Sequence, residues 1–113
     1  MLAATAERAA RIAEDDYALF GAAVVLAEAG EERKAAALAD ELDRRLAPEP
    51  RMLADLVRGS AALARRRYPE AIERFQAAGR RVDSWLVRYA LGRAYVEAGA
   101  FAEAQDELER CKK

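Results

Sequence analysis

The chain has 113 residues, of which 53% are hydrophobic and 35% charged, with 19 basic and 20 acidic side chains and no histidine. This composition fits one compact domain. Alanine, the strongest helix former, accounts for about a quarter of the residues, and β-branched residues are few, so we expect an all-helical fold. The absence of histidine removes the commonest general base and metal ligand. We therefore expect no enzyme, no cofactor, no metal site and no small-molecule substrate.

Charge and apolar patterning bear on partners and location. A formal net charge of -1 creates no overall field for nucleic acid or an anionic membrane, so both are disfavoured as partners. No apolar run approaches the roughly 18 to 20 residues that span a bilayer, and acidic residues stand where a signal peptide has its apolar stretch. The single cysteine, Cys111, is expected to be a small, partly buried apolar residue. The sequence predicts a cytoplasmic protein.

Helical periodicity extends over nearly the whole chain and is interrupted by glycine or proline at positions 30, 48, 50, 69, 79 and 99. The paired acids Asp15 and Asp16 are expected at a helix start, and Asp83 or Ser84 is expected to cap another helix. The pattern predicts seven helices, at about 3–14, 16–29, 31–46, 50–66, 69–78, from 83 or 84 onward, and 101–111. Turns of two to four residues predict an antiparallel array.

The predicted array contains an internal repeat. Gly59 and Gly92 are separated by 33 residues, because 92 minus 59 is 33, and three further pairs share this offset. These pairs are Tyr68 with Phe101, Ala71 with Ala104, and Phe75 with Leu108. A weaker first copy is visible in the segment 26–35, which matches 95–104 at an offset of 69. The repeat indicates that the same helix pair recurs along the chain.

The third copy, with Gly92, Tyr95, Gly99, Phe101 and Ala104, resembles a tetratricopeptide repeat, whose period is 34 residues. Packing explains the pattern, since Gly92 and Ala104 are small where two helices cross closely and Tyr95 and Phe101 fill the space beside them. The second copy departs from the family at position 58, where arginine replaces leucine, and the first copy departs most. The resemblance covers about residues 16–113. It implies an all-α fold in which antiparallel helix-turn-helix repeats stack as a right-handed α-solenoid.

The resemblance also implies the organisation of the chain. One domain, 1–113, would consist of a leading helix at 1–15, a degenerate repeat at 16–49, and repeats at 50–82 and 83–113. Repeat arrays need a polar element to cover their last apolar face, and none follows the third copy. We therefore expect the chain to be a fragment of a longer protein. Similar alanine- and arginine-rich bacterial segments accompany kinase or winged-helix domains, which implies a signalling or regulatory parent.

In tetratricopeptide arrays the first helices of successive pairs line a concave groove, so the resemblance implies which side chains face it. Alignment of the three copies places large apolar or aromatic side chains at successive levels of this face. The candidate partner-binding residues are Tyr17, Leu53 and Leu86, then Phe20, Leu56 and Tyr89, then Val24 and Arg93, and last Leu63 and Val96. One interpretation is a groove for a partner helix or peptide. The alternative is that these side chains pack against one another.

The sequence thus predicts a non-catalytic protein-protein interaction module. A first alternative is a self-association domain that buries the same apolar face in a homodimer. A second, less favoured alternative is an RNA-binding helical repeat, which rests on the arginine runs 65–67 and 80–81. Both runs are expected at helix ends, where positive charge interacts favourably with the helix dipole without any nucleic acid.

Overall fold

The computed structural model describes residues 2–111, apart from the side chains at 2–7, 9, 10, 12, 13 and 101. Over this range the chain is all-helical and contains no strand. The six helices are α1 (Leu2–Glu28), α2 (Glu32–Asp43), α3 (Pro48–Ala64), α4 (Tyr68–Arg81), α5 (Trp85–Ala98) and α6 (Phe101–Cys111). The predicted all-α class and the predicted position of the last helix are confirmed. The predicted side-chain role of Phe101 lies outside the described residues.

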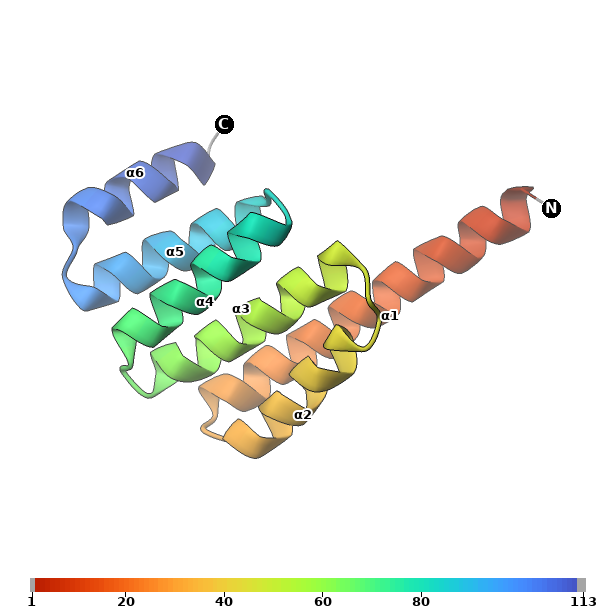
Figure 1. Ribbon diagram of the computed structural model, residues 1–113, viewed down its shortest axis with the longest axis horizontal. Coiled ribbons are helices and arrows are strands. Elements are labelled where there is room, and N and C mark those ends of the chain that lie inside the picture. Colours follow the sequence, from red (N-terminus) through yellow and green to blue (C-terminus); the bar gives the residue numbers. More distant parts are fainter. Residues whose placement is uncertain (1, 112–113) are drawn as a thin grey trace.

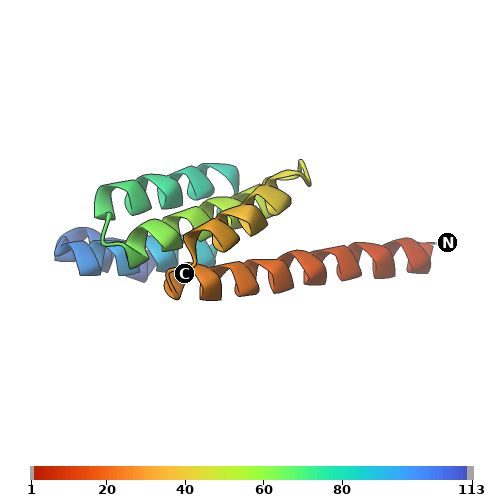
Figure 2. The same ribbon diagram turned by 90° about the horizontal axis from the view of Figure 1, so that it is seen from below.

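The prediction of seven helices is wrong, because the segments 3–14 and 16–29 form the single 27-residue helix α1. No glycine or proline separates them, and aspartate in a helix interior costs less than about 0.7 kcal/mol relative to alanine. Asp16 does not cap a helix. Its side chain is buried, and Arg45 Nε, in the turn after α2, approaches Asp16 Oδ1 at 2.5 Å. The N-terminal part of α1 extends beyond the other helices in both views (Figures 1 and 2).

Several other boundaries shift by two or three residues. Helix α3 begins at Pro48 rather than Pro50, because Ala47 is extended and proline is well suited to the first helical position. Helix α4 continues through Gly79 to Arg81. The predicted interruption at Gly79 is therefore wrong. The prediction of Ser84 as an N-cap is confirmed, since its hydroxyl oxygen accepts a hydrogen bond from the Leu86 N–H at 3.2 Å.

Consecutive helices lie side by side and alternate in direction (Figure 1). Each helix packs against the next one in the chain, and α1 also packs along α3. Helix α3 is central, with ten of its 17 residues buried. In contrast, α3 contacts α5 only sparsely. One side of α5 is consequently not covered by α3, and Trp85, Tyr89 and Val96 on this helix are exposed.

The repeated small residues lie where paired helices cross closely, as the sequence predicts. A Cβ atom at Gly59 of α3 would lie 2.3 Å from the Phe75 ring of α4. At the equivalent crossing of α5 and α6, a Cβ atom at Gly92 would lie 2.8 Å from the Leu108 side chain. The 33-residue repeat of the sequence is therefore also a repeat of helix packing.

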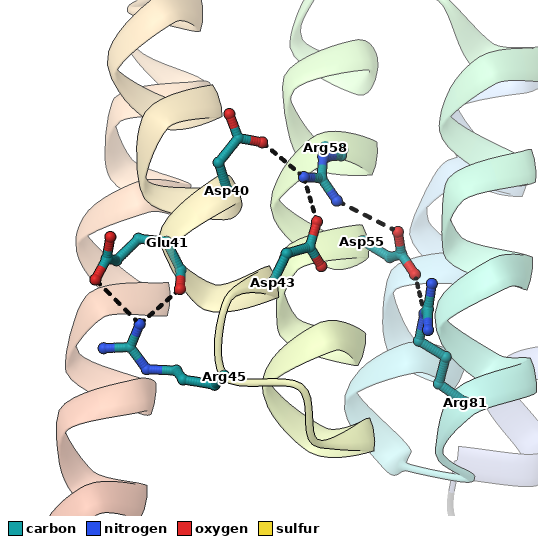
Figure 3. A network of polar contacts seen from close by, with 7 residues as sticks. All are labelled: Asp40, Glu41, Asp43, Arg45, Asp55, Arg58 and Arg81. Carbon is teal, nitrogen blue, oxygen red and sulfur yellow. Dashed lines mark hydrogen bonds and ion pairs between the residues drawn. The ribbon is translucent and has the colours of Figure 1, made fainter.

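An ionic network joins α2, α3 and α4 (Figure 3). Arg58 of α3 donates hydrogen bonds to Asp40 at 2.9 Å and to Asp43 at 2.6 Å, both on α2. The buried carboxylate of Asp55 accepts a hydrogen bond from Arg81 of α4 at 2.8 Å. Partial burial lowers the pKa of Arg58, but its hydrogen bonds to Asp43 and Asp40 outweigh that effect and raise the pKa above the usual value. Arg58 thus links α3 to α2.

Candidate functional site

An apolar concavity lies between α1, α3 and α5, where α3 and α5 are only sparsely in contact. Its volume is about 160 Å³. Phe75 of α4 and Ala90 of α5 also line it. It brings together seven of the ten predicted partner-binding residues: Phe20, Val24, Leu56, Leu63, Leu86, Tyr89 and Arg93. We call this concavity the apolar pocket.

The other three predicted residues do not line the apolar pocket. Leu53 is fully buried in the core, with none of its surface exposed. Tyr17 lies on α1 next to Phe20, and their rings meet edge to face with centroids 6.4 Å apart. Val96 is exposed on α5. The differences follow from the position of each helix, because α3 packs extensively against α1, α2 and α4, whereas α1 and α5 each pack extensively against only two other helices.

A larger polar concavity of about 450 Å³ adjoins the apolar pocket and shares Glu28, Ser60, Leu63 and Arg93 with it. We call it the polar pocket. Its remaining lining residues are Ala64, Arg66, Tyr68 and Glu97. Of the lining residues that the predicted set lacks, Ser60 occupies the same repeat position as Val24 and Arg93, so the alignment could have included it. The inclusion of Glu28, Arg66, Tyr68 and Glu97 depends on how the helices meet.

Two ion pairs hold Arg93 in the polar pocket. Its Nη1 atom lies 3.4 Å from Glu28 Oε1, and its Nε atom lies 3.7 Å from Glu97 Oε1. The first pair connects α5 to α1 across a separation of 65 residues in sequence. All three side chains remain about half exposed, so the pairs contribute little to stability. They do position the Arg93 guanidinium where both pockets meet.

Tyr17 is tied to α3 through its hydroxyl group, which donates a hydrogen bond to Glu49 Oε1 at 2.7 Å. Burial, which has the largest effect, together with the hydrogen bond to Glu49 and the negative charge of Glu49, raises the pKa of Tyr17 to about 12. The folded protein therefore holds this proton more tightly than the unfolded chain does.

This difference predicts a loss of stability in alkali. Between the ordinary tyrosine pKa of 10.0 and the folded value of about 12, the unfolded chain releases the proton first, so unfolding becomes more favourable as pH rises. Tyr17→Phe removes the group and should flatten this part of the pH profile. Denaturant unfolding at a series of pH values measures the slope. Parallel profiles for the wild type and Tyr17→Phe would contradict the assignment.

Other features within residues 2–111 bear on the metal, membrane and RNA interpretations. The described side chains form no cluster of three or more potential metal ligands. No helix in this part of the chain is long and apolar enough to cross a membrane.

Cys111 is half-buried, as predicted, with Sγ 3.4 Å from the Trp85 carbonyl oxygen. The arginines at 80 and 81 lie in the last turn of α4, and those at 65–67 form the turn between α3 and α4.

Comparisons with protein-family models, with curated proteins and with solved structures find no match to the chain. Its site must therefore be interpreted from its own geometry.

Proposed function

We propose that the chain is a non-catalytic interaction module whose apolar pocket binds an aliphatic or aromatic side chain of a partner peptide or helix. We also propose that α1 with α2, α3 with α4, and α5 with α6 are three helix pairs of a tetratricopeptide-like right-handed solenoid. The 33-residue repeat and the close crossings at Gly59 and Gly92 support this arrangement. In such an array α1, α3 and α5 would be equivalent helices, and they contribute every lining residue of the apolar pocket except Phe75 of α4.

The observation that carries the proposal is the convergence of apolar side chains from three helices on one open pocket. Phe20 and Val24 come from α1, Leu56 and Leu63 from α3, and Tyr89 from α5. About 160 Å³ is smaller than the roughly 300–1,000 Å³ of typical small-molecule sites, so the pocket suits one anchoring side chain better than a metabolite. Apolar anchors in such pockets commonly provide most of the affinity of an interface.

Removal of the aromatic side chains that line the apolar pocket should weaken peptide binding. Random peptides displayed on phage would be selected on the wild-type protein, and the enriched peptides made synthetically as probes. We expect them to share a large apolar residue, and we expect Phe20→Ser with Tyr89→Ser to weaken binding at least about tenfold, measured by fluorescence polarisation. Circular dichroism would show whether the variant keeps its helices.

The matched control replaces two exposed residues outside the pocket on the same helices, Val25 of α1 and Trp85 of α5, by serine. They are 66% and 63% exposed. This control should bind the peptides as the wild type does. Failure of the wild type to enrich any peptide, or equal binding by the two double variants, would refute the proposal.

Self-association is a second candidate, because Trp85, Tyr89 and Val96 are exposed on α5 and their spacing places them along one side of that helix. Sedimentation velocity over a range of concentrations tests it. A dimer that dissociates in the variant carrying Phe20→Ser and Tyr89→Ser would favour this function. A monomer at all concentrations would exclude it.

A further inference from the structure

Helices α1, α3 and α5 end in the same backbone motif, but α3 carries a different residue at its central position. A left-handed residue follows each helix, with φ of 83° at Gly30, 60° at Arg66 and 83° at Gly99. In each case the next residue donates a backbone hydrogen bond to a carbonyl in the last turns of the helix, at 2.8 to 2.9 Å. Glycine suits this position because a Cβ atom crowds the neighbouring backbone there. Arg66 is therefore expected to make the fold less stable than a glycine at the same position would.

The side chain of Arg66 lines the polar pocket, whereas its two neighbours do not. Arg65 pairs with Glu32 at 3.0 Å, and Arg67 lies 3.9 Å from Glu70. Among the described side chains, none of the ion pairs within 4.0 Å involves Arg66. The two carboxylates that line the polar pocket, Glu28 and Glu97, both pair with Arg93. The guanidinium group of Arg66 thus forms no ion pair within 4.0 Å with either of these carboxylates.

We propose that Arg66 is a specificity residue that binds an aspartate or glutamate side chain of the partner, next to the apolar residue that fills the apolar pocket. The inference rests on the proposed function. The two pockets share Leu63 and Arg93, so a single peptide can occupy both. The planar guanidinium group forms paired hydrogen bonds with a carboxylate, which gives directional selectivity. A stability cost at a residue that lines a site is typical of a position kept for binding.

The test separates stability from binding with two glycine variants. Arg66→Gly should raise the melting temperature of the protein and lower its affinity for a selected acidic peptide by about tenfold. Leu46→Gly is the matched control, because Leu46 also has a positive φ of 56°, follows α2 and does not line either pocket. It should raise the melting temperature without changing the affinity. Asparagine adopts the same left-handed backbone conformation and has no charge. Arg66→Asn should therefore lower the affinity for the acidic peptide as much as Arg66→Gly does.

The probes are two forms of the tightest peptide selected on the wild type, both acetylated and amidated so that no terminal charge remains. One keeps its acidic residue and the other carries the corresponding amide. The wild type should prefer the acidic form by about tenfold, and Arg66→Gly should bind both forms equally. An equal preference in both proteins, or selected peptides without acidic residues, would overturn the role of Arg66 while leaving the apolar pocket intact. Absence of any selected peptide would overturn the proposed function and this inference together.

Discussion

Replacing Leu53 by alanine is expected to lower the free energy of unfolding by about 2–5 kcal/mol, the range for large-to-small changes in well-packed cores. Leu53 has no exposed surface and lies on α3, which α1, α2 and α4 cover. These helices cannot all move inward to fill the space, so a cavity would remain. Since small domains are stabilised by only about 5–15 kcal/mol, this single change should remove a large part of the total.

Leu46→Ala is the control for this loss, because Leu46 is 74% exposed in the turn after α2. Its effect should stay within about 0.5 kcal/mol. Urea denaturation followed by circular dichroism measures both variants. If Leu53→Ala were no more destabilising than Leu46→Ala, Leu53 would not belong to the core, and its predicted place in the binding groove would have to be reconsidered.

Replacing Gly59 by alanine should also destabilise the fold, by about 1–3 kcal/mol, although alanine is the better helix former. The added Cβ atom would lie 2.3, 2.5 and 2.9 Å from three atoms of the Phe75 ring. Phe75 is only 1% exposed, so its ring cannot move aside without disturbing the core. Helices α3 and α4 would have to separate at this crossing.

Gly21→Ala provides the opposite expectation in the same fold. Gly21 lies within α1, and a Cβ atom there would meet no other atom within 4 Å. This change should raise the free energy of unfolding by about 0.5–1 kcal/mol, because alanine loses less backbone entropy in a helix. Thermal unfolding of both variants measures the contrast. Similar changes for Gly59→Ala and Gly21→Ala would rule out a close crossing at Gly59.

Local patterns in the sequence predict most of the helical framework. Ser84 caps α5, Gly99 ends it in a left-handed turn, and α6 spans the expected residues. The repeat also predicts correctly that Gly59 and Gly92 lie at close helix crossings. These features depend on neighbours in sequence or on a motif that occurs twice, so they can be found without coordinates. The break expected near Asp16 was wrong because aspartate only weakly disfavours a helix interior, and the ion pair with Arg45 depends on tertiary packing.

The lining of the candidate binding pocket could be predicted only in part. Alignment places Tyr17, Leu53 and Leu86 at one level of equivalent helices, but it contains no information on how deeply each helix is covered. Leu53 is buried and Tyr17 is 39% exposed, because α3 is central and α1 lies at one side. The pair of Glu28 and Arg93 joins residues 65 positions apart, and no local pattern indicates it.

Composition, periodicity and repeat spacing therefore determine that this chain forms antiparallel helices with small residues at their crossings, because those features depend on local backbone preferences and on contacts within each pair. The sparse contact between α3 and α5 is a property of the assembled helices. It determines which apolar side chains enter the core and which line an open pocket. Helix packing also places Arg66 in the polar pocket, next to the apolar pocket. The turn that carries Arg66 is positioned relative to α1 and α5 by the packing of the helices between them.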